Sequence, residues 1–391
     1  MVGRTIAVAV SLVVLVAVGA PSGVAGPLRT PSCTNAWTVV QQPPSPPGSG
    51  QLQGVDASSP ADAWAVGSLF TEADQIGHPL TQHFDGTSWS VVPAMDGPNA
   101  STSALTAVSA HAANDAWAVG LSIRPDNLVR TLVEHWGGTA WIRVKSPNAG
   151  HPANGELHGV VALTPDDVWA VGSSGQGAPS RTLIEHWDGT TWSIVPSPNK
   201  GPFPNGLSAV GAVAPDDIWA IGSWFTKGFV DRTLILHWDG TAWTRVPSPN
   251  ADAADNDLVS IAAIATDDVW AVGFHGLHTL TMHWDGTAWT VVPSPTPGGS
   301  SDLAGVVATA PDNVWAVGGR VDRQANALHT LVEHWDGTRW VVVDSANKGS
   351  SDNHLWGVTA ASGRMFAVGY RFKGNGGTGV TVPLTLERCG P

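Results

Sequence analysis

The feature that most constrains this chain is a tandem repeat of about 50 residues. Residues 157–199 contain LHGVVALTPDDVWAVG, a variable loop and RTLIEHWDGTTWSIVPSPN, and residues 207–250 repeat this pattern closely. The tryptophan of the WAVG unit recurs at Trp64, Trp117, Trp169, Trp219, Trp270 and Trp315, and Phe366 takes its place in the last copy. A repeat of this period builds one fold from many similar units, so it decides the domain organisation more than length does.

Each copy is predicted to form four short strands. In the copy at 157–199 we expect them at 157–163, 168–172, 182–187 and 192–195. An Asp-Gly-Thr sequence joins the last two, as expected for a tight hairpin. Two prolines end the fourth strand because proline cannot donate to a ladder. Four strands per copy at this period describe one blade of a β-propeller.

The number of copies predicts an all-β fold, a seven-bladed β-propeller with four-stranded blades, in residues 33–391. Six copies are complete, and the seventh, which begins at Leu355, lacks its fourth strand. Residues 34–40 (TNAWTVV) match that missing strand. We therefore expect the N-terminal strand to complete the last blade and close the ring, which removes its free edges.

The two cysteines, Cys33 and Cys389, lie near the two ends of this domain. Aligned with the other copies, Cys389 falls at the first tryptophan of HWDG, and Cys33 falls at the neighbouring aspartate. We predict a disulfide between them that joins the hairpin left open by the chain ends. In the chain-entropy model, such a bridge contributes about 2–4 kcal/mol.

The first 25 residues have the pattern of a secretory signal peptide. Arg4 precedes an apolar run over residues 6–18, and small residues follow. The run is short for a membrane span, although an uncleaved signal acting as an anchor is the alternative. We expect a secreted protein, extracellular or associated with the cell envelope. The net charge of −13 argues against nucleic acid as a partner.

Most of the 20 tryptophans are assigned to structure. Trp224 and Trp356 are the two that lie outside the repeated columns. The other 18 are the six of the WAVG column, Trp136, Trp187, Trp238, Trp284 and Trp335 of HWDG, and Trp37, Trp89, Trp141, Trp192, Trp243, Trp289 and Trp340 of the fourth strand. Large rings at fixed places fill the space between neighbouring blades.

Histidine and glutamate also recur in columns. The histidines are His83, His135, His186, His237, His283 and His334. One histidine per blade cannot converge on a single ion, so we expect structural hydrogen bonds near the C–D turn. The glutamates, Glu134, Glu185, Glu333 and Glu387, are replaced elsewhere by Gln82, Leu236 and Met282. We expect them to pair between blades.

The repeat resembles the kelch repeat in the order of strand, glycine, variable loop, strand, aspartate turn, tryptophan and proline. This resemblance implies a fold like that of kelch and galactose-oxidase propellers, and it covers nearly all of residues 34–391. Two departures stand out: the kelch double glycine is single here except at Gly318-Gly319, and the turn before the tryptophan is shorter. A copper-radical oxidase is excluded because the chain has one tyrosine, Tyr370, and because both cysteines are expected to form the disulfide.

The variable loops define the candidate binding face. The A–B and C–D turns change little between copies, whereas the B–C loops and D–A connections change most and share the other face. The candidate ligand-binding residues on that face are Trp224, Phe225, Phe229, Phe274, His275, Arg320, Tyr370 and Phe372. Alternatively, these rings only hold loops in place. His275 and His278 lie close in sequence, but no further ligand cluster accompanies them, so no metal site is predicted.

We therefore expect a non-enzymatic propeller that recognises a carbohydrate or an extracellular protein through the face of B–C and D–A loops. No cofactor, no catalytic residue and a monomeric state are expected. The alternative is a hydrolase or lyase acting on a polysaccharide at the mouth of the central channel, because a glycosidase needs only two carboxylates across a cleft. A purely structural envelope protein is a third possibility.

Overall fold

The computed structural model describes residues 33–44, 47–148, 154–175, 179–349, 351–375 and 378–390. They belong to one compact unit, Cys33–Pro391, and the signal peptide predicted at 1–25 lies outside the described residues. The regular structure of the described ranges is entirely β. Nowhere in these ranges is there a helix suited to spanning a membrane.

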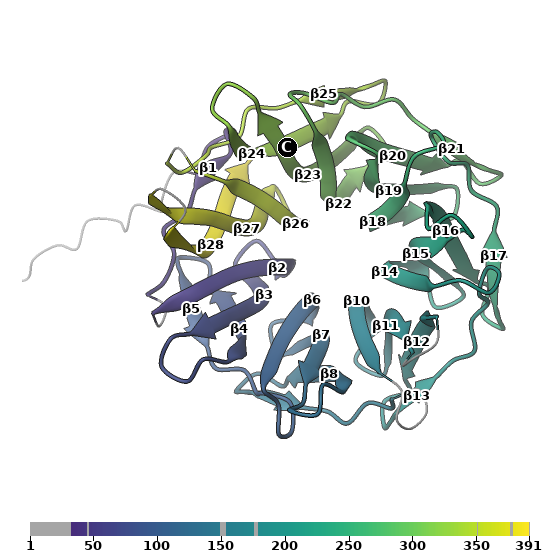
Figure 1. Cartoon of the computed structure of the whole chain (residues 1–391), viewed down its shortest axis with the longest axis horizontal. Helices are drawn as coiled ribbons and strands as arrows, with labels where there is room; N and C mark the ends of the chain where they lie inside the picture. The colour runs from purple at the N-terminus through teal and green to yellow at the C-terminus, as the bar shows by residue number, and fades with distance from the viewer. Residues whose placement is uncertain are drawn as a thin grey trace, which may run out of the picture. The chain divides into compact units, whose positions relative to one another are not determined.

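The strands fall into seven sets of four, and Figure 1 shows the sets arranged around a central opening. The first, innermost strands are β2 (Gly48–Ser59), β6 (Thr102–Ala112), β10 (Gly155–Thr164), β14 (Asn205–Ala214), β18 (Asn256–Ala265), β22 (Ser301–Ala310) and β26 (Asn353–Ala361). The second strands are β3 (Asp62–Thr71), β7 (Asp115–Ile123), β11 (Asp167–Ser174), β15 (Asp217–Phe225), β19 (Asp268–His275), β23 (Asn313–Asp322) and β27 (Arg364–Asn375).

The outer half of each set contains a third and a fourth strand. The third strands are β4 (Gly77–Phe84), β8 (Val129–Trp136), β12 (Arg181–Trp187), β16 (Asp231–Trp238), β20 (His278–Trp284), β24 (Ala327–Trp335) and β28 (Thr378–Cys389). The fourth are β5 (Trp89–Val92), β9 (Trp141–Arg143), β13 (Trp192–Ile194), β17 (Trp243–Val246), β21 (Trp289–Val291), β25 (Trp340–Val342) and β1 (Thr38–Val39). The predicted boundaries for the copy at 157–199 agree with these to within two residues at every end.

Neighbouring strands pair antiparallel within each set, in the order first, second, third, fourth. One parallel bridge, Gly77 to Thr102, links the first two sets into a single eight-stranded sheet. The repeated four-stranded sheets define an all-β propeller, as the repeat predicts.

The set that contains β26, β27 and β28 is completed by β1 from the other end of the chain. Thr38 pairs with Glu387 and Val39 pairs with Leu386. The Cys33–Cys389 disulfide lies beside this pairing, with the two Cα atoms 5.3 Å apart. Trp37 is buried in the same core cluster as Met365 and Ala367 of β27, so the N-terminal segment lies where the sequence places it.

The alignment of the last copy is wrong by one residue. Phe366 pairs with Glu387, as Trp315 pairs with His334 in the preceding set, so Glu387 belongs to the histidine column. Glu387 forms an ion pair of 2.7 Å with Arg364, which stands where five other sets have aspartate and the sixth set has Asn313. Consequently Cys389 takes the aspartate position of HWDG and not its tryptophan. The strand keeps this register because it places the apolar side chain of Leu386 at the buried position where Glu333 lies in the preceding set.

The core is divided among the spaces between neighbouring sets. In each space, a WAVG tryptophan meets the fourth-strand tryptophan of the next set, for example Trp64 and Trp141, whose ring centroids are 4.9 Å apart. Phe366 makes the corresponding contact with Trp89 of the first set at 5.2 Å. These edge-to-face contacts bury the rings where flat sheets would leave wedge-shaped gaps.

The repeated histidines have structural partners, but at a different turn from the one expected. In five sets the histidine Nε2 hydrogen-bonds to an aspartate at the start of the second strand, as between His83 and Asp62 at 2.7 Å. In the sixth, His334 bonds to Asn313 at 2.8 Å. Each imidazole also packs on the neighbouring WAVG tryptophan. The column therefore ties the A–B turn to the third strand.

The Asp-Gly-Thr hairpins are stabilised by their own aspartates. In the third set, Asp188 Oδ1 accepts hydrogen bonds from the backbone of Thr190 and Thr191 and from the Thr190 hydroxyl. These bonds lower the pKa of Asp188 to about 2, with the hydroxyl bond as the largest cause. Gly189 has a φ of 87°, a conformation that favours glycine over other residues.

Candidate functional site

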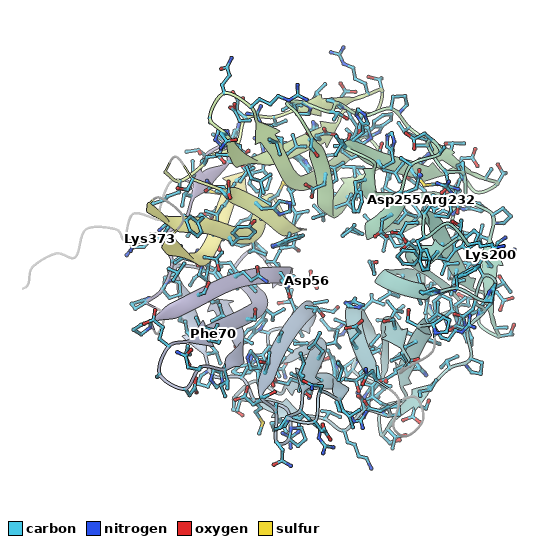
Figure 2. The ribbon with its side chains drawn as sticks, viewed as in Figure 1. Asp56, Phe70, Lys200, Arg232, Asp255 and Lys373 are labelled. Carbon is cyan, nitrogen blue, oxygen red and sulfur yellow. A yellow bond between two sulfur atoms is a disulfide. The ribbon has the colours of Figure 1, made fainter. Side chains whose placement is uncertain are left out.

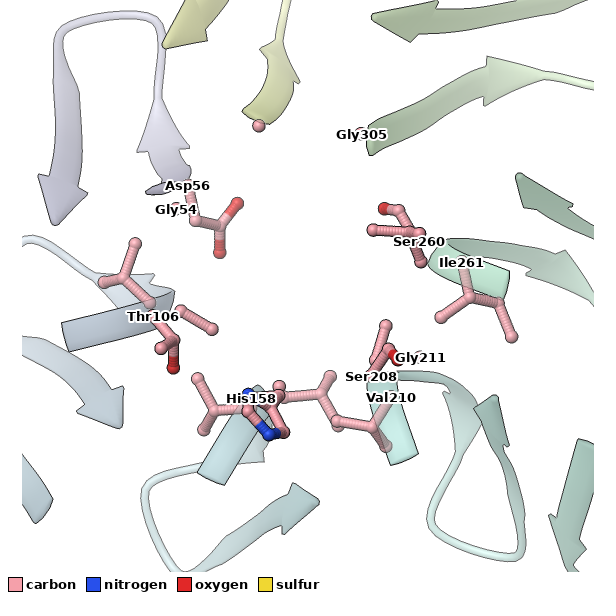
Figure 3. A pocket seen from close by; sticks show the side chains of 18 of the residues that line it. Gly54, Asp56, Thr106, His158, Ser208, Val210, Gly211, Ser260, Ile261 and Gly305 are labelled. Atoms are coloured by element: carbon pink, nitrogen blue, oxygen red, sulfur yellow. The ribbon is translucent and has the colours of Figure 1, made fainter. Parts of the chain in front are cut away.

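A cavity of about 670 Å³ lies at the centre of the unit, and the first strands of all seven sets line it. Short side chains dominate this lining and leave the space open. Figure 3 shows Asp56 and His158 at the edge of the cavity, on different sheets. Figure 2 likewise shows Asp56 near the central opening, whereas Phe70 and Lys373 lie farther out.

Asp56 is one of two acids that line the cavity. Its carboxylate accepts hydrogen bonds from the backbone of Ala57 and Ala110 and from the Thr359 hydroxyl, at 2.9, 2.8 and 3.1 Å. These partners come from three neighbouring sets. Burial raises the pKa of Asp56, and the hydrogen bonds oppose this effect. Asp56 therefore joins the last set to the first two at the cavity wall.

Asp257 is the second acid in the cavity wall, and it has fewer partners. Burial is the main cause that raises its pKa to about 7, followed by the charge of Asp231. Its Oδ1 is buried and has no hydrogen-bond partner among the described residues. A buried carboxyl with a raised pKa has the property that a general acid or base needs near neutral pH.

An aromatic cluster borders the cavity where the sixth and seventh sets meet. It contains His354 and Trp356 of β26 and Tyr370 of β27. The ring centroid of His354 lies 4.2 Å from that of Trp356 and 6.1 Å from that of Tyr370. Trp356 lines the cavity itself, so the cluster is continuous with the central space. We call these three residues the mouth cluster.

Asp302 of β22 holds the mouth cluster from the neighbouring set. Its Oδ2 lies 2.9 Å from His354 Nε2, while His354 Nδ1 is buried without a partner among the described residues. The side chain of His354 is only 5% exposed. Burial raises the pKa of Tyr370, and the charges of Asp352 and Asp302 raise it further. The three rings of the mouth cluster thus lie beside a carboxylate, Asp302, whose orientation is fixed by its contact with His354.

The double glycine at 318–319 makes room for this cluster. A Cβ atom on Gly319 would lie 2.4 Å from Cδ2 of His354, which no real Cβ contact allows. Other sets have Ser68, Leu121, Ser173, Ser223, Phe274 or Tyr370 at this position. The departure from the repeat at Gly319 is therefore coupled to the histidine in the next set.

The eight predicted binding residues lie in the second halves of second strands or just beyond them, towards the B–C loops. Trp224 and Phe225 end β15, Phe274 and His275 end β19, and Phe229 lies in the loop after β15. Arg320 lies in β23, and Tyr370 and Phe372 lie in β27. They are distributed over four sets.

Several of these residues have partners of their own. Lys200 Nζ lies 5.4 Å from the Trp224 ring centroid, and His275 Nδ1 lies 3.0 Å from Asp252 Oδ2. Phe229 is 74% exposed. Tyr370 is the predicted residue that belongs to the mouth cluster. Trp356 stands out in the sequence because it lies outside the columns. His354 and Asp302 were not predicted, and the double glycine was the available signal for them.

Metal ligation is limited in the part of the chain that the structure describes. The cluster with suitable spacing there is Cys33, Glu387 and Cys389, and its cysteines form the disulfide. The imidazoles of His275 and His278 stack with centroids 5.3 Å apart. The histidines of the repeated column are engaged in the hydrogen bonds described above.

The glutamate column lies between sets, away from the cavity. Glu134, Glu185 and Glu333 are fully buried, and desolvation raises their pKa values to about 7, 8 and 8. Glu134 accepts hydrogen bonds from the backbone of Met95 in the preceding set. Both carboxyl oxygens of Glu333 lack a partner among the described residues, so pairing between sets is not general.

The fold and the central cavity define a β-propeller, and solved structures agree with this class. YCF48 from Cyanidioschyzon merolae has a TM-score of 0.54 at 16% identity, covering 90% of this chain and 99% of that one. YCF48 bound to D1 peptide also has a TM-score of 0.54, at 14% identity, covering 93% and 100%. At such identities the similarity shows the fold alone.

Two polysaccharide-acting enzymes have a similar fold. Ulvan lyase, a polysaccharide lyase, has a TM-score of 0.54 at 12% identity, covering 90% of this chain and 94% of that one. A xyloglucanase from Xanthomonas campestris has a TM-score of 0.53 at 12% identity, covering 85% of this chain and 54% of that one. No family model and no curated protein matches the sequence.

Proposed function

We propose that this chain is a secreted, non-enzymatic propeller that binds an extracellular carbohydrate or protein at the loop-side mouth of its central cavity. The observation that carries the proposal is the mouth cluster of His354, Trp356 and Tyr370 beside the cavity of about 670 Å³. Flat rings with a few oriented polar groups suit stacking against a ligand.

A carbohydrate suits this mouth best. A sugar ring presents an apolar face to an aromatic side chain and hydroxyl groups at its edge. Trp356 supplies such a face, and the Asp302 carboxylate held by His354 supplies a hydrogen-bond acceptor. A peptide is the second ligand of this class, and YCF48, which has a similar fold, is known bound to a peptide.

The test compares ligand binding by three forms of the protein on an array of plant, algal and bacterial oligosaccharides and on a peptide library. We expect Trp356→Ala to weaken binding at least about tenfold, because the stacking surface is lost. Phe229→Ala is the matched control, since it removes an exposed ring from the same face but outside the mouth. Equal binding by wild type and Trp356→Ala would contradict the proposal.

An enzyme is the second candidate, and one observation favours it. Asp56 and Asp257 both line the cavity, and burial raises the pKa of each. Two carboxyl groups in different environments can act as acid and base on a polysaccharide. Release of reducing ends or unsaturated sugars that stops in Asp257→Asn, but continues in Asp255→Asn, would replace the binding proposal with catalysis.

We also propose that the seven sets form a ring of seven blades closed by β1, with the kelch-like order of elements noted above. The support is the β1–β28 pairing together with the contact between Phe366 and Trp89. Secretion is proposed from the signal-like residues 1–25 and from the disulfide, since disulfides persist in oxidising compartments. A mature chain that begins after residue 20 or 25 in culture medium would agree with this.

A further inference from the structure

A second groove on the molecule has an unusual charge. It has a volume of about 530 Å³ and lies beside β8 and β9 in the second set. Four of its eleven lining residues are basic: Arg124, Arg130, Arg143 and Lys145. The whole chain has 19 Lys and Arg against 32 Asp and Glu, so this concentration runs against the overall charge. We call these four residues and their surroundings the basic groove.

Arg143 and Lys145 give the basic groove positive charge that no ion pair with a described carboxylate neutralises. Asp126 forms an ion pair of 3.1 Å with Arg124, whereas no described carboxylate is in ion-pair contact with Arg143 or Lys145. Glu134 lies near Arg143, but burial raises its pKa to about 7, so it has only part of its charge at neutral pH. The groove therefore retains an excess of positive charge.

Lys145 distinguishes the basic groove from the corresponding surface of the other sets. Lys145 stands where four other copies have the first proline of the V-P-S-P or V-P-A sequence, namely Pro93, Pro196, Pro247 and Pro293. Arg143 is held by a hydrogen bond of 2.9 Å from Nη1 to the backbone oxygen of Asp96. Arg124 Nε is buried and lacks a partner among the described residues. A donor left without a partner is satisfied when an acceptor enters the groove.

We propose that the basic groove binds an anionic group of a polysaccharide, either a carboxylate or a sulfate ester. Guanidinium groups match the geometry of both oxyanions. The lining contains no aromatic residue, and aromatic anchors are the usual centre of protein–protein contacts. Asn99 and Asn148 offer amides for neighbouring hydroxyl groups. The site is separate from the mouth cluster, and the two lie in different sets.

The test measures binding of the whole protein to dextran sulfate, polygalacturonate, neutral dextran and polyglutamate at several salt concentrations. We expect binding to at least one charged polysaccharide, no binding to neutral dextran, and weakening with salt. The double variant Arg143→Gln with Lys145→Gln should lose at least about tenfold in affinity. Preference for dextran sulfate identifies a sulfate site, and preference for polygalacturonate identifies a carboxylate site.

The control removes the same charge elsewhere. Arg245 occupies in β17 the position that Arg143 occupies in β9, and Arg339 lies in an exposed turn, so Arg245→Gln with Arg339→Gln should bind as wild type does. Melting temperatures verify that both double variants fold. An equal loss in both, no binding to either charged polysaccharide, or stronger binding of polyglutamate overturns the proposal. Trp356→Ala should retain this binding, which separates the groove from the mouth.

Discussion

At the residue scale, the mouth of the cavity depends on the absence of one methyl group. Gly319 leaves the space into which His354 of the next set inserts, and His354 in turn contacts Asp302, Trp356 and Tyr370. The sequence displays this only as a doubled glycine, because the histidine that needs the space is 35 residues away in the chain.

Gly319→Ala should lower stability by about 1–3 kcal/mol and displace the mouth cluster, because the new Cβ overlaps the imidazole. Urea unfolding measures the loss in stability, and ligand binding measures the displacement. Gly206→Ala is the matched control, since its Cβ would meet only the Ser173 Cβ at 3.8 Å. If both substitutions cost the same, the close packing of His354 against Gly319 is not the cause.

A single buried glutamate also affects the pH dependence of stability. Glu333 is fully buried, and its carboxyl has no described partner, so its neutral form is the one that the folded state favours. Folding raises its pKa from 4.5 to about 8. Stability from this group is complete below pH 4.5 and is lost as the pH rises towards 8, because the unfolded chain releases the proton first.

Glu333→Gln should therefore stabilise the protein by about 1–3 kcal/mol at pH 8 and change little at pH 4. Gln82, which occupies the same column in the first set, shows that an amide fits this position. Unfolding by urea across this pH range gives the difference. Glu72→Gln, in an exposed loop, should leave the pH dependence as it is. A constant difference at all pH values would refute the assignment.

At the scale of the element, neighbouring sheets pack together through contacts between their aromatic side chains. In five sets the WAVG tryptophan contacts two tryptophans of the next set, as Trp270 contacts Trp335 and Trp340 at 4.9 and 5.3 Å. The last set uses Phe366 in the same place, with Phe84 and Trp89 as partners. A smaller ring is thus acceptable where the partner ring is also smaller.

Trp270→Ala should cost about 3–5 kcal/mol because it opens a cavity between two sheets, whereas Trp270→Phe should cost about 1–2 kcal/mol. Thermal and urea unfolding compare the two. Trp224→Ala is the useful contrast, since this ring is partly exposed and lies outside the repeated columns. An equally large loss from Trp224→Ala would mean that position in the repeat does not decide the importance of a tryptophan.

The elements themselves were predictable because their signals are local and repeated seven times. Alternation, the Asp-Gly-Thr turn and the paired prolines locate strands to within two residues. The register of β28 was not predictable, because the match of Glu387 to the glutamate column was outweighed by the burial of Leu386 and by the Arg364–Glu387 ion pair. The site was predictable only in part, since His354, Asp302 and Gly319 meet across two sets.

At the scale of the whole molecule, the disulfide joins segments 356 residues apart. Reduction should lower the melting temperature by a few degrees. The bond lowers the conformational entropy of the unfolded chain, which stabilises the folded state by about 2–4 kcal/mol. Calorimetry with and without reductant measures the shift, and thiol labelling verifies reduction. The variant Cys33→Ser with Cys389→Ser should melt at the lower temperature under both conditions. Identical melting of oxidised and reduced protein would refute the prediction.

The pairing of β1 with β28 also has a consequence for biosynthesis. During translation, the segment that forms β1 is made before the other strands, and its partner β28 is made after them, so β1 has no strand to join until all the other sets have been synthesised. Every other strand finds its neighbours within the same or the preceding repeat. Nascent chains stalled before residue 380 should therefore contain folded sheets and an unpaired, protease-accessible segment around β1, which pairs only after β28 has been made.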